Sequence, residues 1–269
     1  MSVGFDHIDL NACRARGVRV GFTPDVLTDA TAELTVALAL AATRRLMEGE
    51  FSSLSFVLYL TLCLTSVIVL GVEAVKSGAW GTWSPMWLCG PSLKGSTVGI
   101  VGLGRIGSAV AERLRPFGVS QILYNSRTRK TNEVERGAKL VSLDELLTQS
   151  DFVIVTCALT PDTKELFNER AFSLMKPTAV FINTSRGGIV DQQALYAALK
   201  SNRIFAAGLD VTSPEPLPTD SPLLSLPNCV VLPHIGSATI ETRSMMAELC
   251  AKNIVAALNG DTMPAELKS

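Results

Sequence analysis

The sequence predicts an α/β protein built on a doubly wound parallel sheet. From residue 97 onward, short apolar runs typical of strands alternate with helical patterns, as they do in parallel sheets that carry helices on both faces. The first of these runs, at 98–101, is followed by three closely spaced glycines and then by a helical pattern. Hydrophobic residues make up 47% of the 269 residues, which is ample for a core in one large domain or two smaller ones.

The individual elements follow from local patterns. Residues 29–46 are rich in helix formers, with acidic side chains early and arginines late, as a helix dipole favours. Ser142 opens a capping box and Asp191 suits an N-cap, so a helix is expected after each. The segment VRVGFTP is expected to form a brief strand that ends at Pro24. Strands of the sheet are expected at 98–101, 122–124, 152–157, 179–183, 206–211 and 229–232.

The three glycines, Gly102, Gly104 and Gly107, have G-x-G-x-x-G spacing. In a dinucleotide-binding turn the first glycine permits the tight turn, the second lets the backbone approach a pyrophosphate, and the third allows close helix packing. The helix that starts near Arg105 then directs its free N–H groups at the phosphates. The strand in front and the helix behind favour a dinucleotide site over a flexible glycine turn. We expect this site to be lined by Gly102, Gly104, Arg105, Ile106, Gly107 and Ala158.

The end of the second strand indicates which dinucleotide is bound. NAD binders place an acidic residue there for the ribose hydroxyls, but this strand ends with Asn125 and Ser126, and Arg127, Arg129 and Lys130 follow. A guanidinium suits a 2′-phosphate through charge-assisted hydrogen bonds. The sequence therefore predicts NADPH over NADH; the alternative is a solvated basic turn without a ligand.

Composition excludes several classes of function. A net charge of −1 leaves no basic surface for nucleic acid. The six cysteines are scattered, with no C-x-x-C pair and no histidine cluster, so we expect no metal site and no disulfide framework. The first residues lack the pattern of a signal peptide, and a cytoplasmic location is expected.

Residues 51–72 carry no charge, and this uncharged stretch is long enough for a membrane span. Against a span, the stretch is rich in Ser, Thr and β-branched residues, has no basic cluster close by, and interrupts an otherwise soluble pattern. We favour a buried or disordered insertion over a membrane helix. The Gly- and Pro-containing loop that follows holds Trp80, Trp83 and Trp87, which suit either core packing or an interface or lid.

The catalytic chemistry is suggested by polar residues that follow three different strands. His234, one of only two histidines, lies just after the strand at 229–232; Arg186 and Glu215 follow the strands at 179–183 and 206–211. Parallel strands bring these ends to one edge, where open α/β sheets bind ligands. A cation, a carboxylate and an imidazole suit reduction of a 2-keto acid: Arg186 clamps the carboxylate, His234 protonates the forming alkoxide, and Glu215 holds the histidine.

These motifs, read in order, carry a family resemblance. GLGRIG, NTSRGGIVD, GLDVTSPEP and LPHIGSAT resemble the signature blocks of the D-isomer-specific 2-hydroxyacid dehydrogenases. MSVGFDH, VGFTPDVLTD, WLCG, SRTRK and MPAELK are similar to the branch that reduces glyoxylate and hydroxypyruvate. The resemblance covers almost the whole chain except 51–72. It implies an NADPH-dependent reductase that converts such 2-keto acids to D-2-hydroxy acids.

The resemblance also implies roles for individual residues. Arg186, Glu215 and His234 are implied as the catalytic triad, and Asp210 lies beside the nicotinamide. A homodimer is implied, because the family's counterpart of Trp87 reaches into the neighbouring subunit's site. The further residues implied near the cofactor are Ser126, Thr184 and Gly236, and those near the substrate are Val3, Gly4, Trp87 and Ser237.

The chain departs from the family pattern in two places. Family members begin with a further segment of the substrate domain, so we expect residues 1–20 and 240–269 to be remnants of that domain. The cofactor domain is expected at 21–239, interrupted at 51–72. The exposed apolar face left on the C-terminal helix invites aggregation. The alternative functions are therefore a catalytically impaired NADP-binding module, such as a splice variant, and a membrane-anchored form.

Overall fold

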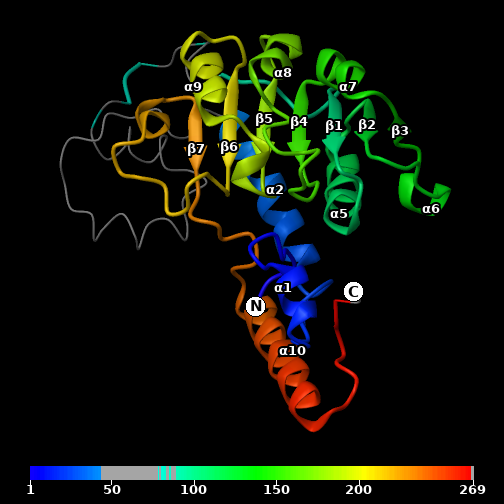
Figure 1. Ribbon diagram of the computed structural model, residues 1–269. Helices are drawn as coiled ribbons and strands as arrows, with labels where there is room; N and C mark the ends of the chain where they lie inside the picture. The colour runs from blue at the N-terminus through cyan, green and yellow to red at the C-terminus, as the bar shows by residue number, and fades with distance from the viewer. Residues whose placement is uncertain (44–77, 79, 83–84, 86–88, 268–269) are drawn as a thin grey trace.

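A seven-stranded, wholly parallel sheet organises the chain, in the order β3-β2-β1-β4-β5-β6-β7 (Figure 1). The computed structural model describes residues 1–43, 78, 80–82, 85 and 89–267. The strands are β1 (Thr97–Val101), β2 (Gln121–Asn125), β3 (Lys139–Leu140), β4 (Phe152–Val155), β5 (Val180–Asn183), β6 (Ala206–Leu209) and β7 (Cys229–Val231). The order reverses between β1 and β4, as in doubly wound sheets. The predicted α/β fold class is thereby confirmed.

Helices cover both faces of the sheet. On one face lie α2 (Thr28–Thr43) and α5 (Arg105–Leu114), and on the other lie α7 (Leu143–Gln149), α8 (Glu169–Leu174) and α9 (Gln192–Lys200). The shorter helices are α1 (Leu10–Ala15), α6 (Asn132–Glu135) and the 3-10 turns η1 (Arg115–Phe117), η2 (Gly187–Ile189) and η3 (Pro222–Ser225). The capping predictions hold, because the side chains of Ser142 and Asp191 accept backbone N–H groups at the starts of α7 and α9.

The strands alternate between two hydrophobic cores. In β4, Phe152 and Ile154 pack beneath α2 and α5, whereas Val153 and Val155 pack beneath α7, α8 and α9. All four side chains are fully buried. Because successive side chains of a strand point to opposite faces, covering both faces requires apolar residues at every position. This explains why the strands are continuous apolar runs in the sequence.

The first residues of the chain lie beside its last helix, α10 (Ile240–Asn259), away from the sheet (Figure 1). The expected brief strand before Pro24 is reduced to one antiparallel bridge, in which Gly21 pairs with Glu266. Two further backbone hydrogen bonds, Phe22 N–H to Ala265 O and Leu267 N–H to Val20 O, extend this pairing. A single bridge forms because the partner is a short segment after α10, which the local sequence pattern does not reveal.

Several predictions fall on residues that the structure does not describe: the insertion at 51–72, Trp83 and Trp87, and the end of the helix predicted at 29–46. Trp80 is described and is 64% exposed, so it is not part of the core. Within the described ranges, no helix combines the length and the apolar character needed to cross a membrane.

Candidate cofactor and catalytic site

The glycine turn leaves β1 in a conformation that only glycine adopts readily. Gly102 has φ +100°, and a Cβ there would lie 2.6 Å from the Cys157 backbone. A Cβ on Gly107 would lie 2.3 Å from the Gly102 carbonyl oxygen. The first and third glycines are therefore required by the turn and by the contact between α5 and β1.

Gly104 differs from the other two glycines, because a Cβ there would meet no protein atom within 4 Å. Gly104 is the N-cap of α5, and no side chain caps this helix. The first backbone hydrogen bond of the helix runs from Ser108 N–H to Gly104 O, at 2.9 Å. The open space and the uncapped helix start fit the pyrophosphate of a dinucleotide. Arg105, in the same turn, pairs with Asp25 at 2.5 Å between Nε and Oδ1.

The basic turn after β2 separates into residues with different surroundings. Arg129 pairs with Glu135, at 3.2 Å between Nε and Oε1. The buried Tyr124 hydroxyl donates to the same carboxylate oxygen at 2.5 Å. These hydrogen bonds, from Tyr124 first and then Arg129, lower the pKa of Glu135. Arg127 is exposed and has no ion-pair partner among the described residues, which leaves its guanidinium available to a ligand.

The histidine and glutamate predicted to act together are in contact. His234 Nδ1 lies 2.9 Å from Glu215 Oε2, and the second carboxylate oxygen accepts the Thr212 backbone N–H at 3.0 Å. Glu215 thus orients the imidazole through Nδ1, and Nε2 is the nitrogen that Glu215 does not hold. The imidazole is 49% exposed and therefore accessible to a ligand.

Asp210, at the end of β6, holds the loop that carries the histidine. Its carboxylate accepts the backbone N–H groups of Ile235 and Gly236, both at 2.8 Å. His234 itself has φ +55°, a left-handed conformation that these neighbouring bonds fix. Burial raises the pKa of Asp210, and the two N–H groups partly oppose that rise. The resemblance placed Asp210 beside the nicotinamide; the contacts found here are to the loop.

Arg186 follows β5 and lies at the same carboxyl edge of the sheet. The buried Asn183 side chain shapes the turn before it, donating to the Arg186 carbonyl at 2.9 Å and accepting the Ser185 N–H at 3.0 Å. The Arg186 guanidinium reaches residues 1–20, where its Nε donates to Asp6 Oδ1 at 3.0 Å. Sequence reasoning missed Asn183 and Asp6. An amide at a strand end signals the first, whereas only the fold reveals the second.

The remaining predicted residues are distributed around this edge. Thr184 is buried, with its hydroxyl 2.8 Å from that of Thr35 on α2. Val3 and Ser237 are half-buried, Ala158 is exposed, and Gly236 is buried against Asp210. Trp87 lies outside the described residues.

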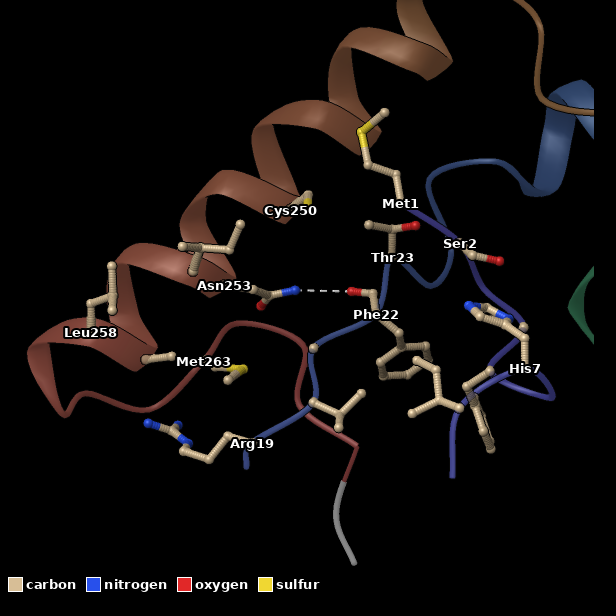
Figure 2. A pocket seen from close by; sticks show the side chains of 17 residues that line it. Met1, Ser2, His7, Arg19, Phe22, Thr23, Cys250, Asn253, Leu258 and Met263 are labelled. Atoms are coloured by element: carbon tan, nitrogen blue, oxygen red, sulfur yellow. Dashed lines mark hydrogen bonds between the residues drawn. The ribbon is translucent and has the colours of Figure 1, made fainter. Parts of the chain in front are cut away.

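A cavity of about 270 Å³ lies elsewhere, between the first residues and α10 (Figure 2). Of the predicted site residues that the structure describes, only Gly4 lines it. The Asn253 amide donates to the Phe22 carbonyl at 3.0 Å beside this cavity, joining α10 to the first residues (Figure 2). The cavity is separate from the glycine turn and from the histidine–glutamate pair.

The sheet order and the glycine turn define a Rossmann-type NAD-binding domain. Residues 58–236 match the family described as D-isomer specific 2-hydroxyacid dehydrogenase, NAD binding domain. The chain therefore belongs to the D-isomer specific 2-hydroxyacid dehydrogenase family, whose members are oxidoreductases.

Relatives and solved structures agree with this assignment. The human glyoxylate reductase/hydroxypyruvate reductase is 54% identical over all of this chain, which covers 75% of the human protein. A glyoxylate reductase from Paecilomyes thermophila superposes with a TM-score of 0.82 at 33% identity, over 99% of this chain and 73% of that one. An NADPH-dependent glyoxylate/hydroxypyruvate reductase from Sinorhizobium meliloti, in complex with NADP and malonate, superposes with a TM-score of 0.81 at 34% identity. The match covers 99% of this chain and 75% of that one.

Proposed function

We propose that this protein is an NADPH-dependent reductase that converts glyoxylate and hydroxypyruvate to the corresponding 2-hydroxy acids. The observation that carries the proposal is the contact between His234 and Glu215 at the sheet edge where Arg186 also lies. The human and Sinorhizobium meliloti proteins named above are reductases of these two keto acids, which supports the substrate class. The exposed Arg127, with no carboxylate at the end of β2, supports NADPH over NADH.

Each side chain has a defined task in this proposal. A bound nicotinamide supplies the hydride to the carbonyl carbon. Arg186 binds the substrate carboxylate, together with backbone N–H groups of Val3 and Gly4. His234 donates a proton from Nε2 to the carbonyl oxygen, and Glu215 stabilises the imidazolium that holds this proton beforehand. We extend the proposal to a homodimer, which the implied role of Trp87 supports.

The direct test is replacement of the proposed acid. His234→Ala should lower kcat with glyoxylate by about 10²–10⁴-fold, the usual contribution of a general acid. NADPH affinity should change little, because His234 is not part of the glycine turn. The measurement is NADPH oxidation followed by absorbance, with cofactor binding followed separately by fluorescence titration.

His7→Ala is the matched control, because His7 is the only other histidine. Its turnover should stay close to that of the wild type. A His234→Ala enzyme with near-normal kcat would remove the acid role. A wild-type protein that binds NADPH without any turnover would instead support the catalytically impaired NADP-binding module.

A further inference from the structure

The Arg186 guanidinium is fixed on two sides by groups of this chain. Its Nε donates to Asp6 Oδ1 at 3.0 Å, across a sequence separation of 180 residues. Its Nη1 donates to the neighbouring Ser185 carbonyl at 2.7 Å. A guanidinium has five N–H donors in one plane, so these two bonds determine the direction of that plane.

The third nitrogen of the guanidinium lies against Gly4. A Cβ on Gly4 would lie only 1.7 Å from Arg186 Nη2, so a larger residue at position 4 would displace the guanidinium. Under the proposed function, the N–H of Gly4 and the guanidinium bind the same substrate carboxylate. Asp6 occupies the Nε edge of Arg186, while Nη2 lies against Gly4, the residue whose N–H would act with it.

The chemistry of Asp6 suits this arrangement. The Arg186 and Asp6 side chains are 26% and 29% exposed, so water competes only partly for their hydrogen bond. Burial raises the pKa of Asp6, but the hydrogen bond and charge of Arg186 outweigh it, and the net pKa is lowered. An ionised carboxylate only accepts hydrogen bonds and a guanidinium only donates them, so the hydrogen bond can run only from Arg186 to Asp6.

We propose that Asp6 is a positioning residue, which orients the Arg186 guanidinium so that its remaining donors and the Gly4 backbone bind a 2-keto acid carboxylate together. This inference rests on the proposed function and deepens it. In this role Asp6 acts through its contact with Arg186 rather than by binding the substrate itself. Without Asp6, the guanidinium regains rotational freedom that must be lost again on binding.

The test compares three variants at position 6 by steady-state kinetics with glyoxylate. Asp6→Ala should raise KM by about tenfold or more, with a smaller change in kcat, because carboxylate binding is lost before chemistry is. Asp6→Asn retains an oxygen acceptor for Nε and should stay within about threefold of wild-type KM. Asp6→Glu shifts the acceptor by one methylene group and should also raise KM, which keeps the test valid if Asp6→Ala does not fold.

Asp9→Ala is the matched control, because Asp9 is a carboxylate of the same segment that caps α1 and does not contact Arg186. Its KM should be unchanged. Unchanged KM in folded Asp6→Ala, equal damage in Asp6→Asn, or equal damage in Asp9→Ala would each overturn the inference. If the wild type has no turnover, the proposed function fails. The role of Asp6 can then still be tested by calorimetric titration with malonate. Asp6→Ala should lower the affinity for malonate, whereas Asp6→Asn should not.

Discussion

Arg127 and Arg129 lie two residues apart on the turn after β2, and the sequence alone does not assign them different roles. The fold separates them through Glu135, which lies in α6 and accepts hydrogen bonds from Tyr124 and Arg129. Arg129 thereby helps to close the turn on the buried tyrosine. Arg127 is left on the exposed side, where the adenosine end of a dinucleotide is expected.

Replacing Arg127 should change the choice of cofactor. Arg127→Asp should lower NADPH affinity by about 10–100-fold, because one charge-assisted hydrogen bond is lost and a repelling charge is added. NADH affinity should hold or rise. The measurement is the ratio of kcat/KM values for the two cofactors.

Arg129→Ala is the matched control for this prediction. It should leave NADPH affinity within about threefold while lowering the thermal midpoint, since its partner is Glu135 rather than a ligand. An Arg127→Asp variant that keeps the wild-type cofactor ratio would remove the 2′-phosphate role of this residue.

At the scale of elements, the glycine turn shows how one motif combines folding and binding requirements. Gly102 is required by its φ of +100° and by the nearby Cys157, and Gly107 by its contact with β1. Gly104 has open space in front of it, so the protein fold does not require glycine there. The requirement at Gly104 is expected to come from the ligand.

This difference predicts that alanine at Gly104 affects cofactor binding, whereas alanine at Gly102 affects stability. Gly104→Ala should keep the free energy of unfolding within about 0.5 kcal/mol of wild type, as other substitutions without contacts do. It should still weaken NADPH binding, because the new methyl group points at the pyrophosphate position. Gly102→Ala should lower the free energy of unfolding by about 1–3 kcal/mol through backbone strain alone. Denaturant unfolding and NADPH titration of both variants would separate the two effects; equal loss of stability would contradict the assignment.

Much of the element pattern could be predicted from the sequence, because the buried strands are continuous apolar runs and the caps of α7 and α9 are local. The strand ends were less accurate: residues 156–157 and 210–211 leave the sheet because they belong to the loops at the carboxyl edge. The partners of Asp6 and of Gly21 could not be predicted, since each lies at least 180 residues away.

On the scale of the whole molecule, the described residues lie in two parts of unequal size. The sheet and its helices form the larger part, and residues 1–23 with α10 and the segment after it form the smaller one (Figure 1). Asn253 connects the smaller part: its amide nitrogen donates to Phe22 O at 3.0 Å and its amide oxygen accepts from Ala265 N–H at 2.9 Å. Apolar side chains on α10, such as Ile254 and Leu258, remain exposed.

Removing the Asn253 amide should therefore loosen the smaller part. Asn253→Ala leaves the Phe22 carbonyl and the Ala265 N–H without their partner, at an expected cost of about 1–3 kcal/mol. Hydrogen exchange should increase in residues 18–23 and 263–267 but not in the sheet. Asn259→Ala, at an exposed position of the same helix, is the control and should leave exchange unchanged. An equal increase in hydrogen exchange in the sheet and in the smaller part would contradict a role of Asn253 that is confined to the smaller part.

The ion pair between Arg19 and Glu266 joins positions 247 residues apart in the chain. A ribosome therefore finishes the whole nucleotide-binding sheet before the segment that pairs with residues 19–22 has left the exit tunnel. Because domains fold as units during synthesis, the sheet can complete its folding before residues 19–22 pair with the segment around Glu266. The smaller part of the molecule must then be the last to assemble in the cell.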